Sequence, residues 1–164
     1  MGRHGLWLRS AVYIALVVAL SNLLLLPVVD RVLFEPVRLA IAAGAGHVLA
    51  LVQDNVRVVG QRVFVGPSAV EIVNSCTGLD VGVFLASAML VFPAPWRARA
   101  QGVVAAFAIV LAVNFLRVLT LCWLNASSPR AFELVHVYVW PAFITAVCLA
   151  TLLVWIQLVP ARDD

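Results

Sequence analysis

Four long apolar stretches constrain the fold of this chain more than any other feature. They lie near residues 10–29, 77–95, 101–124 and 134–158. A membrane hydrocarbon core of about 30 Å takes roughly 20 helical residues to cross. A chain of 164 residues that is 64% hydrophobic and 12% charged cannot pack as a water-soluble globule. We therefore predict an all-α membrane protein with about four transmembrane helices, forming a single integral membrane domain over residues 1–164.

The segment between the first two stretches, residues 30–75, is expected to lie at the outer membrane face. Residues 37–53 are apolar but short and contain glycine and histidine, which favours an interfacial or re-entrant helix over a fifth span. Three short runs rich in β-branched residues follow, near 56–59, 62–65 and 69–73. Gly60 and Gly66 stand at the turns between them. A small β-hairpin or meander is therefore predicted to lead the chain to Cys76.

Arginine alone carries the positive-inside signal, because the chain contains no lysine. The arginines divide evenly between the two sides, but short loops carry most of this signal. The short loop with Arg97 and Arg99, together with the basic N-terminus, favours cytoplasmic N- and C-termini. The first stretch follows Arg3 and Arg9 and is not followed by a small-residue cleavage pattern, which predicts an uncleaved signal anchor.

Cys76, Arg117 and His136 are predicted to meet at one membrane face. Cys76 opens the second stretch and His136 opens the fourth, so two crossings separate them under either topology. Arg117 lies roughly 12 Å along its helix from the same surface, where a charge needs a partner or a wet cavity. A thiol, a guanidinium and an imidazole supply the nucleophile, oxyanion partner and proton carrier of cysteine acyl transfer. A helix N-terminus and a nearby cation would favour the thiolate of Cys76.

Polar residues around this trio predict a cleft just below the outer surface. Asp80 stands four residues after Cys76 and is the expected ion-pair partner of Arg117. Asn114, three residues before Arg117, would hydrogen-bond the guanidinium or a substrate carbonyl. Backbone N–H groups at the helix start would bind an oxyanion. The remaining members of the predicted site are Asn74, Thr77 and Gly78.

Other kinds of site find little support in the sequence. The three cysteines and three histidines show no metal-ligand spacing, and no cofactor is expected. No basic face with interleaved aromatics predicts nucleic-acid binding. Two rival functions stay open: a thiol–disulfide oxidoreductase that uses Cys76 and Cys122, and a non-enzymatic membrane scaffold in which Arg117 and Asp80 hold helices together.

The run Asn74-Ser75-Cys76-Thr77-Gly78, the pair Asn114-x-x-Arg117 and His136, in this order, resemble the exosortase/archaeosortase family, most like the short exosortase H type. The likeness covers roughly residues 70–145. It implies a multipass enzyme of the bacterial cytoplasmic (inner) membrane with its active site at the periplasmic face. Such an enzyme cleaves a C-terminal sorting signal, made of a motif, a transmembrane helix and a basic tail, from exported proteins.

The resemblance also assigns roles to the predicted site. Cys76 would be the nucleophile that forms an acyl thioester, and Arg117 and His136 would complete the catalytic set. The partners would be the exported proteins and the lipid bilayer. The substrate helix would dock beside small residues such as Gly82, which allow close helix approach.

Overall fold

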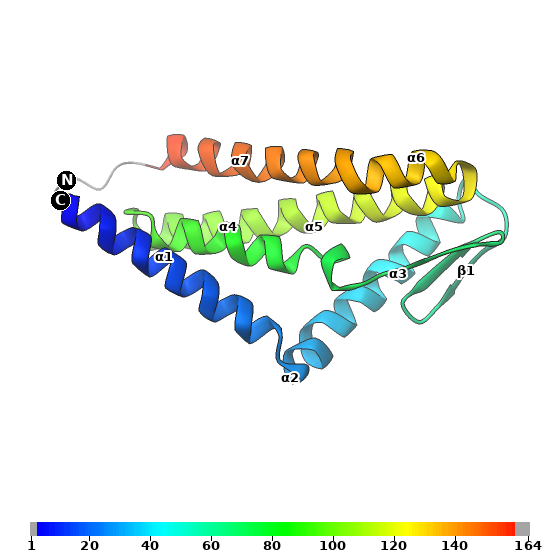
Figure 1. Cartoon of the computed structure of the whole chain (residues 1–164), viewed down its shortest axis with the longest axis horizontal. Coiled ribbons are helices and arrows are strands. Elements are labelled where there is room, and N and C mark those ends of the chain that lie inside the picture. Colours follow the sequence, from blue (N-terminus) through cyan, green and yellow to red (C-terminus); the bar gives the residue numbers. More distant parts are fainter. Residues whose placement is uncertain (1–2, 160–164) are drawn as a thin grey trace.

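The computed structural model describes residues 3–159, which form a set of helices with one small sheet at one end (Figure 1). In Figure 1, α5 runs along the length of the molecule, α7 lies beside it, and α1 and α3 meet in a V at α2. In chain order the elements are α1 (Arg3–Leu24), α2 (Pro27–Val29), η1 (Asp30–Phe34), α3 (Glu35–Leu49), β1 (Val56–Val59), β2 (Arg62–Val65), β3 (Ser68–Glu71), η2 (Asn74–Cys76), α4 (Leu79–Val91), α5 (Trp96–Ser127), α6 (Pro129–Leu134), η3 (Val135–Val139) and α7 (Trp140–Leu158).

Three continuous helical stretches in the described residues are long and apolar enough to cross a membrane: Pro27–Leu49, Trp96–Ser127 and Pro129–Leu158. The predicted first span, 10–29, is broken, because α1 ends at Leu24 and a new helix begins at Pro27. Proline suits the first position of a helix, where no N–H is needed. The structure therefore supports three candidate spans and does not confirm the predicted four.

The predicted interfacial helix over 37–53 is wrong in its bounds. Residues 37–49 belong to the second half of the 23-residue helix Pro27–Leu49, which is long enough to span, whereas residues 50–53 lie after its end. The helix begins ten residues earlier and ends four residues earlier than predicted, and its glycines and histidine do not interrupt it. In the structure Asp30 pairs with Arg38 inside the same helix, so these charges do not break it.

Helix α4 is shorter than the span predicted over 77–95. Its 13 residues rise about 20 Å, less than a hydrocarbon core. It begins after Gly78, whose φ of 74° is left-handed, and it ends at Val91, because the next residue, Phe92, is extended before a proline. Arg99 donates to the carbonyls of Leu90 and Ala94 at 3.0 and 2.9 Å and so closes its C-terminal end.

Both π-helical segments, η1 and η3, lie just before a proline. Pro36 and Pro141 lack the N–H that would bond the carbonyl four residues earlier, at Val32 and Val137, and these two residues lie inside the π segments. The missing donors account for the switch from α to π bonding at these two places. Such π segments are frequent at functional sites, and the second one carries His136.

The sheet confirms the predicted meander. Its three antiparallel strands have the order β1-β2-β3, with Val59 opposite Arg62 and Val65 opposite Ser68. Each connection is therefore a two-residue turn. Gly60 and Gly66, the first residue of each turn, both have a φ of 58°, which glycine adopts without strain.

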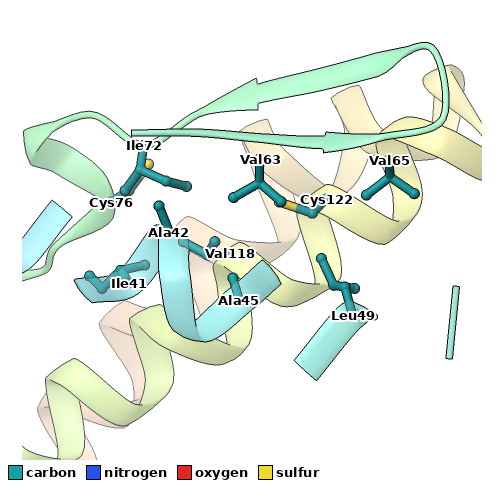
Figure 2. Close-up of a cluster of buried hydrophobic side chains, with 10 residues drawn as sticks. All are labelled: Ile41, Ala42, Ala45, Leu49, Val63, Val65, Ile72, Cys76, Val118 and Cys122. Atoms are coloured by element: carbon teal, nitrogen blue, oxygen red, sulfur yellow. The ribbon is translucent and has the colours of Figure 1, made fainter. Parts of the chain in front are cut away.

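Two buried clusters share α5. Near its C-terminal half, α5 packs with α3, the sheet and the turn of Cys76 (Figure 2). Nearer its N-terminal half, it packs with α4 and α7. Cys76 therefore lies where the sheet-bearing half of the molecule meets the all-helical half. The first cluster consists of Ile41, Ala42, Ala45, Leu49, Val63, Val65, Ile72, Cys76, Val118 and Cys122.

Candidate active site

Cys76 ends the 3₁₀ turn η2, which links the sheet to α4. Cys76 was predicted to open the helix, but α4 begins three residues later, at Leu79. The Cys76 N–H donates to the Val73 carbonyl at 2.9 Å, and the residue is 8% exposed and lies beside Ile72 (Figure 2). The thiol is thus held in a fixed turn at the edge of the core.

Thr77 and Gly78 fix the shape of this turn. The Thr77 hydroxyl donates to the Asn74 carbonyl at 2.7 Å and accepts from the Leu79 N–H at 3.3 Å. Gly78 is left-handed, and a Cβ there would lie 2.2 Å from Nδ2 of Asn114. Glycine is therefore required both by the backbone and by the close approach of α5. Asn114, predicted to belong to the site, does lie against this turn, and its Nδ2 donates to Val110 at 2.9 Å.

Arg117 reaches the Cys76 turn from α5. Its Nη1 lies 3.4 Å from the Ser75 carbonyl, the residue before Cys76. Its Nε is buried and has no hydrogen-bond partner within the described part of the chain. A guanidinium that contacts the turn of a thiol and has a donor without a protein partner is a group that can bind a negatively charged oxygen.

The expected ion pair between Arg117 and Asp80 is not formed among residues 3–159, where the ion pairs join Arg38 to Asp30 and Arg62 to Glu71. The later start of α4 explains the difference. Asp80 falls in the first turn of that helix, where it is exposed and lines a cavity instead of facing α5.

His136 lies in the π segment η3, half-buried, with its ring 5.5 Å from that of Phe132. No hydrogen bond joins it to Cys76 or Arg117 in the described residues. Arg117 and His136 do lie at similar depths, because α5 and α6 form a hairpin around Ser128. Counting about 1.5 Å per residue from Ser128 puts them roughly 16 and 12 Å along the two arms.

A buried arginine that the sequence analysis assigned only to the outer segment, Arg38, adjoins the site. Its Nη1 and Nη2 donate to the Asp30 carboxylate at 2.7 and 3.2 Å, and its Nε donates to Gln61 at 3.0 Å. Nη1 also donates to the side-chain oxygen of Asn74, whose Nδ2 donates to Asp30 at 2.9 Å. The only sequence signal for this cluster was a pair of opposite charges inside one apolar helix.

A cavity of about 280 Å³ opens beside the Cys76 turn, where α1, η1, η2 and α4 meet. Its walls combine apolar side chains with hydroxyl, amide and carboxylate groups. The lining residues are Ser21, Leu24, Leu25, Phe34, Asn74, Ser75 and Asp80. Two of them immediately precede Cys76, so a group bound here would lie next to the thiol-bearing turn.

The three cysteines are free. Cys122 belongs to the same buried cluster as Cys76, but Figure 2 shows its side chain beside Val63, on the other side of Val118. Among the described residues, no group of three histidine, cysteine or acidic side chains is placed to hold a metal ion.

The fold and site define a helical membrane protein with a thiol, a guanidinium and an amide gathered around one turn. Residues 4–154 match the family model described as transmembrane exosortase (Exosortase_EpsH). This match covers most of the chain, and the chain belongs to the transmembrane exosortase family. Comparisons with curated proteins and with solved structures gave no match.

Proposed function

We propose that this protein is a membrane-embedded cysteine transpeptidase or protease that cleaves the C-terminal sorting signal of exported proteins. The observation that carries the proposal is the Cys76 turn with the Arg117 guanidinium against it, Nη1 at 3.4 Å from the Ser75 carbonyl and Nε buried without a partner. Membership of the exosortase family supports the same reading. In this account Cys76 is the nucleophile, Arg117 binds the oxyanion and His136 carries the proton.

The reaction has two steps. In the first, Cys76 passes its proton to His136 and its sulfur attacks the carbonyl carbon of the scissile peptide, whose oxygen becomes negative beside Arg117. The C–N bond then breaks, and the leaving amine takes the proton from His136, which leaves a thioester. In the second step, water or an amine gives a proton to His136 and attacks the thioester, so the C–S bond breaks and Cys76 regains a proton.

His136 is the member of this set that stands apart from the turn in the free protein. Catalytic hydrogen bonds often tighten only when the substrate is bound. The similar depth of His136 and Arg117 along the α5–α6 hairpin, and the π segment that carries His136, support its place in the set.

The substrate is proposed to approach within the bilayer of the bacterial cytoplasmic membrane, with the Cys76 turn at the periplasmic face. The cavity beside Asn74 and Ser75 would take the residues next to the scissile bond. The docking face expected around Gly82 is corrected, because a Cβ at Gly82 would meet the Phe107 ring of α5 at 2.5 Å. Gly82 therefore serves packing between α4 and α5 inside the protein.

A processing assay in cells tests the proposal. The assay would follow the mass of exported proteins that end in a helix and a basic tail. It would compare wild type with Cys76→Ser, Arg117→Ala and His136→Ala. Each variant has a control of the same residue type: Cys122→Ser, Arg62→Ala and His47→Ala. Loss of cleavage in the first three alone, at normal membrane levels, is the expected result.

The same assay separates the rival functions. A thiol–disulfide oxidoreductase that pairs Cys76 with Cys122 would lose function in Cys122→Ser as well. A non-enzymatic scaffold would keep normal processing in Cys76→Ser, a nearly isosteric change. Either result would contradict the proposed transpeptidase.

A further inference from the structure

We infer that Arg38, together with Asp30 and Gln61, forms a positioning cluster that holds the Cys76 turn in its reactive place. This inference rests on the proposed function, because it concerns the same thiol. The cluster contacts the turn through the side chain of Asn74 and touches no reacting atom, so Arg38, Asp30 and Gln61 act as positioning residues.

The Arg38 guanidinium uses its fork to join three separate segments. Two nitrogens bind the Asp30 carboxylate of η1, at 2.7 and 3.2 Å, and Nε binds Gln61 in the turn between β1 and β2 at 3.0 Å. The third link goes to Asn74 of η2. A planar guanidinium fixes the directions of its hydrogen bonds, so these segments are held in one mutual arrangement.

The cluster holds the chain entering the turn at two points. Gln61 bonds Arg38 through its side chain, and its main-chain carbonyl accepts from the Ile72 N–H at 2.8 Å. Asn74 is bound by both Arg38 and Asp30, and its own carbonyl accepts the Thr77 hydroxyl at 2.7 Å. Restraint therefore passes from Arg38 along main-chain and side-chain hydrogen bonds to the residues on both sides of Cys76.

The location of the cluster matches such a role. Arg38 is 7% exposed and does not line the cavity. Asn74, which it contacts, lines the cavity together with Ser75. The amide that Arg38 and Asp30 orient is thus part of the cavity wall. Loss of the cluster would release both that wall and the thiol, without removing any side chain proposed to do chemistry.

Thiol reactivity provides a test that does not depend on the substrate. In a Cys122→Ser/Cys148→Ser background, Cys76 is the single thiol, and its rate of alkylation by N-ethylmaleimide would be measured on the full chain in detergent. Asp30→Asn keeps the size of the side chain but removes the negative charge that pairs with Arg38, and Asp30→Glu restores that charge. Glu71→Gln is the matched control, because it breaks an exposed ion pair with Arg62 on the same sheet.

Asp30→Asn is expected to raise the alkylation rate of Cys76 at least tenfold and to lower kcat for processing, with little change in KM. Asp30→Glu is expected to return the alkylation rate and kcat part of the way to their wild-type values. Glu71→Gln is expected to leave the alkylation rate and kcat unchanged. If Asp30→Asn folds poorly, Gln61→Leu, which removes one bond only, is expected to give a smaller rise in alkylation.

Unchanged alkylation of Cys76 in Asp30→Asn and Gln61→Leu would overturn the positioning role, whatever happens to processing. This failure is distinct from a failure of the proposed function, which Cys76→Ser tests. If Cys76→Ser processes normally while Asp30→Asn still exposes the thiol, the cluster holds the turn but the turn has no catalytic task.

Discussion

Two arginines flank the Cys76 turn, and their surroundings differ. Arg38 approaches through Asn74 and bonds a carboxylate and two amides, so its guanidinium is well supplied with partners. Arg117 approaches through the Ser75 carbonyl at 3.4 Å and keeps a buried Nε without a partner in the residues described. A saturated guanidinium fixes structure, whereas an unsaturated one has capacity left for a substrate. We therefore propose that Arg38 holds the turn and that Arg117 takes part in the chemistry.

The largest expected effect is on catalysis at Arg117. Arg117→Ala is expected to lower the processing rate about 10²–10³-fold, the usual loss when one oxyanion donor is removed. The melting temperature in detergent should change little, because no carboxylate in the described residues loses an ion-pair partner. A large fall in melting temperature with normal processing per folded molecule would break the comparison.

The reverse pattern is expected at Arg38. Arg38→Met keeps the apolar stem but leaves Asp30, Gln61 and Asn74 without their common donor, so the melting temperature should fall by roughly 5 °C or more. Thermal unfolding in detergent measures this. The double variant Arg38→Met/Asp30→Leu should have a higher melting temperature than Arg38→Met, because it also removes the Asp30 carboxylate that has lost its partner. An unchanged melting temperature in Arg38→Met would show that the cluster does not hold the turn.

Gly78 tests the contact between the turn and the Arg117 helix. Gly78→Ala forces an alanine into the left-handed conformation, which costs about 1–2 kcal/mol. The added Cβ would also clash with the side-chain amide of Asn114. Gly60→Ala is the matched control, because Gly60 has a similar positive φ but nothing within 4 Å of an added Cβ. The free energy of unfolding in detergent should therefore fall more for Gly78→Ala than for Gly60→Ala. Equal losses at the two glycines would remove the close approach of Asn114 from the account.

The smallest effect is expected at the exposed Arg62–Glu71 pair on the sheet. Both side chains are more than half exposed, at 59% and 52%, although Nη2 and Oε2 are 2.9 Å apart. Exposed pairs of this kind often contribute nothing measurable. Glu71→Gln should leave both melting temperature and processing unchanged. A clear loss would mean that the sheet acts on the turn through its surface as well as through Gln61.

Local signals in the sequence predicted the sheet that leads to Cys76. A glycine in each of the two-residue gaps between the β-branched runs specifies a tight turn through local geometry alone. The Asn114 and Arg117 pair was also placed near the turn by counting crossings, and the structure puts both against it. Their roles, like those of Cys76 and His136, stay predictions.

What the sequence did not reveal depends on long-range contacts. Asp30 and Arg38 fall in the segment predicted to lie at the outer membrane face, and in the structure they form an ion pair within one helix. Arg38 also contacts Asn74, which lies 36 residues further along the chain. Both residues lie within the continuous helical stretch Pro27–Leu49. The position predicted for Asp80 is wrong because α4 begins a few residues later than expected. A shift of this size turns a side chain to another face of the helix.

The most direct test of the central claim is detection of a thioester on Cys76. Purified protein would be mixed with a peptide substrate that contains a sorting motif and its helix, quenched in acid and analysed by intact mass and peptide mapping. The account predicts an acyl adduct on Cys76 that hydroxylamine removes and that is absent in Cys76→Ser. Cleavage of the substrate by Cys76→Ser at the wild-type rate, with no adduct in the wild type, would contradict it.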